Sequence, residues 1–316
     1  MQPTYSGVVG APVTPFTADN KVDYDTFAKQ VNFLVESGVR LIAHPMHIGE
    51  SVNMTDAERR ELARVLVSAA GGRVPTFVHV SYAGTDLAID LATHTVKAGA
   101  TGIVMMPPYH WKSGDKAILE HYTSVMNACG GKLIVYNNPK AVTVTISPDL
   151  FEQLMDRIPG FVAIKDATFH MENFTDVAEL LARKKKDIAL YTGIEFLLTS
   201  MPVGGNGCFS ACSEVAPRLV NELYQACLRA DIPKARELQF KVRRLLRVCM
   251  HNYPATIKYA MELMGRPVGI TRKPILPATA EEKAWVKAEL TAMGIFDSET
   301  MGWNVSGGAN KISAAA

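Results

Sequence analysis

FVAIKDA, at residues 161–167, places a lysine directly after four apolar residues. A short, nearly continuous apolar run of this kind is typical of a strand that is buried on both faces of a parallel sheet. Lys165 would then stand at the carboxyl end of a core strand. This position alone is compatible with two roles. Lys165 could be a desolvated, catalytic amine, or it could be an ordinary lysine at the barrel rim that pairs with Asp166.

The same kind of run recurs along the chain and alternates with segments of helical periodicity. The other apolar runs lie at residues 7–16, 40–45, 74–80, 102–108, 132–139, 188–193 and 207–211. Helical patterns lie at residues 23–37, 55–69, 86–98, 116–129, 148–157, 172–183, 195–202 and 214–229. Eight strand–helix units predict an α/β fold, a (β/α)8 TIM barrel. An open doubly wound sheet is the alternative, but GAPVTPF does not provide the glycine-rich phosphate loop that it needs.

The strand pattern stops after residue 230. Helical signals alone follow, at residues 234–252, 254–264 and 280–293. The predicted organisation is therefore a barrel over residues 1–230, a C-terminal helical extension over 231–300, and a flexible tail over 301–316, which is small and polar.

Composition excludes several classes of protein. The 33 basic and 31 acidic residues give a net charge of +2, which provides no electrostatic footprint for nucleic acid or an anionic membrane. No apolar stretch reaches the length of a membrane span, and the N-terminus does not read as a signal peptide. The five cysteines are odd in number and scattered, so a cytoplasmic protein without disulfides is expected.

Reactive groups of a barrel enzyme lie at the carboxyl ends of its strands. Buried there, the amine of Lys165 would have a lowered pKa, and a neutral amine adds to ketones to form a Schiff base. Tyr136 ends the preceding strand, from which its phenol could relay protons. In chain order, the strand-end candidates are Thr14, His44, His47, Glu50, His79, Tyr109, His110, Trp111, Tyr136, Asn137, Lys165, Gly193, Glu195 and Ser210.

Two other readings of these strand ends stay open. A zinc-dependent aldolase would use the histidines of the same face, which are His44, His47, His79 and His110, and His-x-x-His is a known ligand spacing. Against it, His44 and His79 lie within strand-end runs and could point into the helix layer. A non-catalytic barrel that senses a small molecule is the other reading, and the Tyr136–Lys165 pair argues against it.

YNNP at 136–139, followed by the lysine of IKDA on the next strand, resembles the dihydrodipicolinate synthase and N-acetylneuraminate lyase superfamily. The resemblance spans roughly residues 5–297. Supporting matches are GVVGAPVTPF, Gly49-Glu50-Ser51, PPY at 107–109, the Gly193 turn, GGNGCFSACSEVAP at 204–217, and the closing segment KPILPATAEEKAWVKAELTAMG.

The resemblance implies a Schiff-base lyase, a class I aldolase or hydratase-aldolase, that needs no cofactor or metal. Lys165 would condense with a 2-oxo acid, above all pyruvate, and Tyr136 would be the general acid/base. Tyr109 matches a tyrosine that is lent across a dimer interface to a proton relay. The implied substrate-binding residues are Thr14, Gly49, Glu50, Ser51, Asn137, Gly193, Ser210 and Trp111, with backbone N–H groups of 49–51 holding the carboxylate. A homotetramer, built as a dimer of dimers, is the implied assembly.

Two departures from the family pattern bear on the substrate. Where members commonly read Gly-Thr-Thr-Gly-Glu, this chain reads Met46-His47-Ile48-Gly49-Glu50, so His47 replaces a relay hydroxyl and is a candidate proton shuttle. The synthases carry an arginine two residues after the proline of YNNP, for the carboxylate of the second substrate. Here that position is Ala141, and Lys140 cannot provide a planar bidentate fork.

The second departure makes dihydrodipicolinate synthesis doubtful. The Asn-Pro-x-Ala turn is closer to the hydratase-aldolases of arylidene-pyruvates, although their first loop differs from this one. A dehydratase/aldolase of 2-keto-3-deoxy sugar acids is a further alternative. His110 and Trp111 would face a bulky substrate half or pack in an interface.

Overall fold

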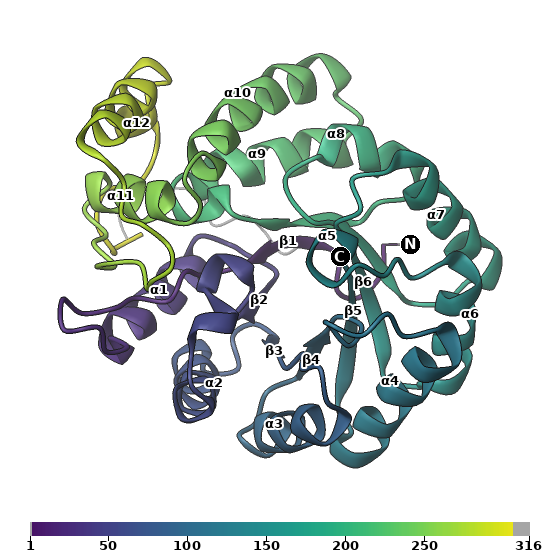
Figure 1. Ribbon diagram of the computed structural model, residues 1–316. Coiled ribbons are helices and arrows are strands. Elements are labelled where there is room, and N and C mark those ends of the chain that lie inside the picture. The colour runs from purple at the N-terminus through teal and green to yellow at the C-terminus, as the bar shows by residue number, and fades with distance from the viewer. Residues whose placement is uncertain (1, 306–316) are drawn as a thin grey trace.

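The chain folds into a closed barrel of eight parallel strands inside a ring of helices (Figure 1). The computed structural model describes residues 2–305. β1 pairs with both β2 and β8, so the barrel closes and the open-sheet alternative is wrong. The strands are β1 Gly7–Gly10, β2 Leu41–His44, β3 Thr76–His79, β4 Gly102–Met105, β5 Lys132–Asn137, β6 Phe161–Asp166, β7 Ala189–Thr192 and β8 Gly207–Ser210.

The helices follow the predicted periodicity closely. Thr55 and Glu58 form the predicted capping box at the start of α2, which satisfies two N–H groups that the helix leaves free. The barrel helices are α1 Tyr24–Glu36, α2 Asp56–Ala70, α3 Thr85–Lys97, α4 Asp115–Cys129, α5 Pro139–Val142, α6 Pro148–Arg157, α7 Met171–Lys184, α8 Leu197–Ser200 and α9 Pro217–Leu228. Short 3-10 turns are η1 His47–Gly49, η2 Ser51–Asn53, η3 Met201–Val203 and η4 Cys212–Glu214.

Two predicted helix boundaries differ from the structure. The helix predicted at 195–202 is only α8 followed by η3, and the one predicted at 214–229 begins at Pro217, after η4. Proline has no N–H and its φ suits the first helical turn, so Pro217 fixes the start of α9.

The barrel closes at a point of very close backbone approach. A Cβ on Gly207 would lie 1.9 Å from the carbonyl oxygen of Gly7, and Gly207 has a φ of +153°. Only glycine tolerates both conditions. This residue therefore allows β8 to pair with β1.

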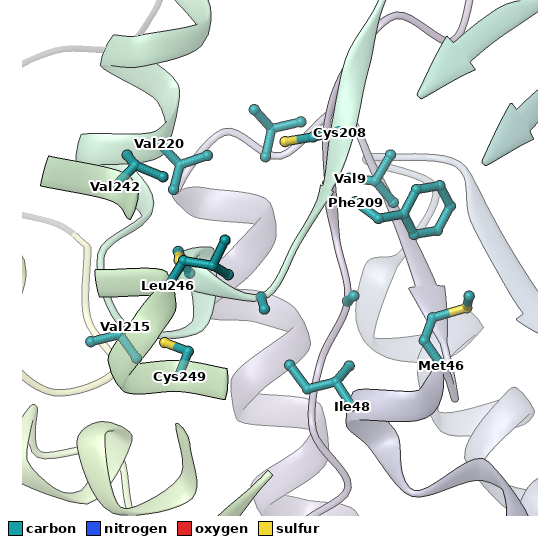
Figure 2. Packing of buried hydrophobic residues seen from close by; sticks show 14 of the residues in the cluster. Val9, Met46, Ile48, Cys208, Phe209, Val215, Val220, Val242, Leu246 and Cys249 are labelled. Atoms are coloured by element: carbon teal, nitrogen blue, oxygen red, sulfur yellow. The ribbon is translucent and has the colours of Figure 1, made fainter. Parts of the chain in front are cut away.

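Apolar side chains form two large cores. One lies between the strands and α1 to α7. The other joins the strands, α9 and the C-terminal helices, and Figure 2 shows Val220 of α9 beside Val242 and Leu246 of the longest C-terminal helix. Each fully buried apolar side chain contributes roughly 1.5–3 kcal/mol, so the second core fixes the extension to the barrel.

The extension is helical, as its sequence predicts. It comprises α10 Ile232–Met250, α11 Ala255–Leu263, α12 Ala280–Ala292 and α13 Ile295–Ser298. Arg266 donates to the carbonyl oxygens of Thr300 and Gly302, and Trp303 meets Phe33 edge to face. Gly302 and Trp303 of the predicted tail thus contact the folded body, while residues 306–316 lie outside the described residues. None of the helices in residues 2–305 has the length and apolarity to cross a bilayer.

Candidate active site

Lys165 and Tyr136 stand side by side at the carboxyl ends of neighbouring strands. Strand register pairs Tyr136 of β5 with Lys165 of β6. The Lys165 side chain is buried, with 5% of its surface exposed. Its Nζ lies 4.0 Å from the ring centre of Tyr136 and 4.4 Å from that of Phe209. The amine is thus enclosed by two aromatic rings inside the barrel.

The surroundings of Lys165 favour its neutral form. Burial lowers the pKa of the amine to about 7, and the Glu195 carboxylate opposes that effect. Desolvation penalises the ammonium because water no longer solvates it. The carboxylate of Asp166 does not pair with Lys165: it accepts hydrogen bonds from Thr168 and Asn173. The reading of Lys165 as a rim lysine paired with Asp166 is therefore wrong.

Glu195 is a buried carboxylate in the loop after β7. Its Oε1 accepts hydrogen bonds from Ser210 Oγ and from the N–H of Cys212, both at 2.7 Å. Its Oε2 has no hydrogen-bond partner within residues 2–305. Burial raises the pKa of this carboxyl. Ser210, a predicted pocket residue, therefore donates to Glu195, and its part in binding substrate stays a prediction.

Asn138 links Tyr136 to His47, and sequence reasoning missed it. Its Nδ2 donates to the Tyr136 hydroxyl at 2.9 Å and lies 3.4 Å from His47 Nδ1. Burial raises the pKa of Tyr136, so the phenol is neutral near pH 7. Because the hydroxyl oxygen accepts from Asn138, its own proton is free for transfer. The second asparagine of YNNP was the only signal for this role.

His47 lies beside Tyr136. The ring centres are 5.6 Å apart. Burial, and then the charge of Lys165, lower the pKa of His47 to about 4. The imidazole is therefore neutral near pH 7, with both a donor and an acceptor nitrogen.

His79 has a fixed tautomer. Its Nδ1 lies 3.1 Å from the carbonyl oxygen of Pro45, which only accepts, so Nδ1 carries the proton. Its Nε2 then accepts from Ser81 Oγ at 2.7 Å, and that hydroxyl accepts in turn from the N–H of Met106. His79 is a neutral wall of the site, 6.2 Å from the ring of Tyr136.

Hydrogen bonds hold the loop after β2, at the carboxyl end of that strand. Thr14 Oγ1 donates to the carbonyl oxygen of Gly49 at 2.5 Å and also contacts His44 Nε2. The N–H groups of Gly49 and Glu50 donate to carbonyl oxygens inside the turn. These two N–H groups are paired within the turn, and a carboxylate held by N–H groups of residues 49–51 stays a prediction. The Ser51 hydroxyl is buried without a partner within residues 2–305 and is the available donor.

Glu50 ties this loop to the C-terminal extension. It adopts the left-handed conformation, with a φ of 57°. Its carboxylate forms a buried ion pair with Lys258 at 2.8 Å and accepts from the N–H of Arg272 at 2.9 Å. Both of its oxygens are engaged in these contacts, and substrate binding by Glu50 stays a prediction. Lys258 and Arg272 gave no signal in the sequence.

Three other predicted residues make structural contacts or are exposed, and their part in binding substrate stays a prediction. Asn137 exchanges two hydrogen bonds with the backbone of Ile146, which leaves its amide occupied. Gly193 permits close packing, since a Cβ there would lie 2.6 Å from that of Ala167. Trp111 is 62% exposed.

Tyr109 is half-buried against the second core. Its proposed part in a neighbouring subunit's relay concerns an assembly and stays a prediction.

The four histidines of the zinc alternative do not converge. His44 packs on Phe27 of α1, with ring centres 4.4 Å apart, so it points into the helix layer. His79 lies toward Tyr136, and His110 is exposed. Over the described residues, no set of three or more His, Cys, Asp or Glu side chains could hold a metal ion.

Comparison with known proteins decides the family. A sequence model described as the Dihydrodipicolinate synthetase family matches residues 4–293. The chain belongs to this family. It is 30% identical over 295 residues to 4-hydroxy-tetrahydrodipicolinate synthase of Chlorobium chlorochromatii (strain CaD3), covering 93% of this chain and 99% of that protein.

Solved structures agree with this assignment. The dihydrodipicolinate synthase from Aquifex aeolicus has a TM-score of 0.86 at 27% identity, over 92% of this chain and 99% of that one. YagE, a prophage protein of the dihydrodipicolinic acid synthase family from E. coli K12 solved in complex with pyruvate, has a TM-score of 0.87 at 25% identity and the same coverage. The chain is thus a carbon–carbon lyase of the aldolase type, as its sequence predicted.

Burial of Lys165 predicts a cost in stability that depends on pH. The pKa of Lys165 is lower in the folded than in the unfolded protein, so the unfolded state binds more protons between pH 7 and 10.5. Lys165→Met should raise the free energy of unfolding below pH 7 by on the order of a few kcal/mol. This gain should shrink as the pH rises from 7 to 10, as measured by urea denaturation.

Lys29→Met, on the exposed face of α1, is the control and should show no such pH-dependent gain. If Lys165→Met is less stable than the wild type at both pH 6 and pH 9, the amine is not strongly desolvated.

Proposed function

We propose that the enzyme forms a Schiff base between Lys165 and pyruvate and makes or breaks the carbon–carbon bond at the pyruvate methyl carbon. The observation that carries this proposal is the enclosed amine of Lys165, with a pKa of about 7 and the Tyr136 ring at 4.0 Å. A neutral amine is the nucleophile that such chemistry needs at neutral pH. The neighbouring structure with bound pyruvate supports the substrate.

In the cleavage direction, Lys165 Nζ adds to the C2 ketone of a 4-hydroxy-2-oxo acid, and water leaves to give an iminium. The C3–C4 bond then breaks, and its electrons enter the iminium to form an enamine. The C4 hydroxyl loses its proton as the aldehyde forms. Protonation of C3 and hydrolysis release pyruvate and the free lysine.

We propose that Tyr136 moves these protons, and its contacts support this role. Its hydroxyl oxygen is held by Asn138, which leaves the phenol proton directed elsewhere. His47 lies next in line and is neutral, so it can donate from one nitrogen and accept at the other. We propose that His47 replaces the hydroxyl that this loop lacks. Ser51, whose hydroxyl is buried and unpaired in the described structure, is the proposed donor to the pyruvate carboxylate.

Synthesis of 4-hydroxy-tetrahydrodipicolinate is the second candidate, favoured by the names of the curated relatives. Its product is a dicarboxylate, so the second substrate brings a carboxylate of its own. Ala141 and Lys140 are exposed residues of α5, and neither offers the planar two-pronged donor of an arginine. This supports aldol chemistry on another aldehyde. The assembly as a tetramer stays a prediction, which the mass in solution tests.

Reductive trapping tests the Schiff base. Incubation with pyruvate and borohydride should add the mass of one reduced pyruvate, and peptide mapping should locate it on Lys165. Lys258, the other buried lysine near the site, should carry none. Lys165→Met should not be labelled. If the wild type is not labelled by pyruvate or by other 2-oxo acids, the proposal fails.

Removal of the Tyr136 hydroxyl tests the proton relay. Tyr136→Phe should lower kcat for pyruvate release from aldol adducts by roughly 10²–10⁴-fold, the usual value of general acid/base catalysis. Borohydride trapping at Lys165 should persist, because the ring that encloses the amine remains. Tyr259→Phe, on α11, is the matched control and should retain full activity. A kcat within threefold of the wild type would exclude Tyr136 from the relay.

A further inference from the structure

The ammonium group of Lys258, on α11, is held by acceptors from three separate segments of the chain. Its Nζ donates to the carbonyl oxygens of Thr14 at 2.8 Å and Ile270 at 2.5 Å. It also pairs with Glu50 Oε1 at 2.8 Å, and only 3% of the lysine side chain is exposed. An ammonium has three protons to donate, so each proton has one acceptor. No step of the proposed reaction uses this group.

Two of these acceptors belong to residues that grip the turn after β2. The N–H of Glu50 donates to the carbonyl oxygen of His47 at 3.0 Å. The hydroxyl of Thr14 donates to the carbonyl oxygen of Gly49 at 2.5 Å. Lys258 therefore holds the backbone of this turn through two neighbours at once. We name Lys258, Glu50 and Thr14 the lysine clamp.

The clamped turn carries the imidazole of the proposed relay. His47 Nδ1 lies 3.4 Å from Asn138 Nδ2, which donates to the Tyr136 hydroxyl at 2.9 Å. The first of these distances is already longer than a normal hydrogen bond. Proton transfer needs heavy atoms within about 2.6–3.2 Å of each other, or one bridging water between them. A small displacement of the turn would therefore remove His47 from the relay.

We propose that Lys258 is a positioning residue: the lysine clamp holds His47 at the distance from Tyr136 that proton transfer needs. This inference rests on the proposed function. The backbone of Glu50 supports it, since its φ of 57° is a left-handed conformation that residues other than glycine seldom adopt. The buried ion pair holds the residue in this conformation. Because Lys258 acts through the turn, its loss should slow proton transfer and leave Schiff-base formation intact.

The charge of Lys258 makes the lysine clamp dependent on pH. Burial lowers the pKa of this amine to about 8; Glu50, from the loop after β2, opposes the effect, and Arg272, from the loop after α11, adds to it. The neutral amine has two protons for three acceptors, so one contact is lost. We therefore expect kcat for pyruvate release to fall as the pH rises through 8. Trapping of pyruvate at Lys165, which needs a neutral amine, should continue.

Removal of the ammonium group tests the positioning role. Lys258→Met should lower kcat for pyruvate release from aldol adducts by roughly 10²-fold, the scale of a misplacement of about 1 Å, and should change KM by less than about threefold. Borohydride trapping at Lys165 should persist. The fall of kcat above pH 8 should disappear, because the clamp is already lost. Lys287→Met, at an exposed position of α12, is the matched control and should keep the wild-type kcat and pH profile.

A double-mutant cycle separates positioning from general damage to the fold. In a His47→Ala background, Lys258→Met should lower kcat by less than about threefold further, because the relay that it positions is already absent. Losses that multiply in full would overturn the inference, since Lys258 would then act independently of His47. A wild-type kcat in His47→Ala would also overturn it, while trapping at Lys165 would still support the Schiff base.

The wild-type pH profile keeps the inference testable if Lys258→Met does not fold. A kcat that stays constant as the pH rises through 8, with trapping at Lys165 intact, would overturn the positioning role. A fall in kcat over this range, with trapping unchanged, supports it. Absence of trapping in the wild type would instead refute the proposed function itself.

Discussion

The site depends on the burial of one amine, that of Lys165, away from water. Lys165 is enclosed by Tyr136 and Phe209, and desolvation brings its pKa to about 7. In water the same group would be almost wholly protonated at neutral pH and would not attack a ketone. Glu195 moderates the effect, since its carboxylate favours the ammonium. Burial of this amine costs stability, and the proposed reaction gives the buried residue a use.

Contacts from the C-terminal extension hold the loops around Lys165 in place. Gln239 of α10 donates to the carbonyl oxygen of Glu195 and accepts from the N–H of Leu198, so the extension fixes the loop after β7. Tyr253, also from the extension, is buried, and burial, with a smaller effect of the nearby Glu195 carboxylate, raises its pKa. The pair of Glu50 and Lys258 fixes the loop that bears His47. The C-terminal helices therefore support the site as well as the fold.

The fold and the reactive pair could be predicted from the sequence because both are local signals. Apolar runs and helical periodicity give the order of strands, and strand order places Lys165 beside Tyr136. The roles of Glu50, Asn137 and Gly49 could not be predicted in this way. Whether a polar group is free depends on partners far away in sequence, such as Lys258 for Glu50, and no pattern near residue 50 reveals them. Asn138 was missed because the sequence does not show which of two adjacent asparagines contacts Tyr136. The structure shows that Asn138 does, while Asn137 bonds to Ile146.

The central claim is that Lys165 is held near its neutral form, and its pKa can be measured directly. The enzyme would be labelled with ¹³C at lysine Cε, and the Lys165 signal assigned by its loss in Lys165→Met. Its chemical shift would then be followed by NMR as the pH is changed. A midpoint close to pH 7 is predicted. A midpoint near 10.5, the ordinary value for a lysine, would contradict the account of the site.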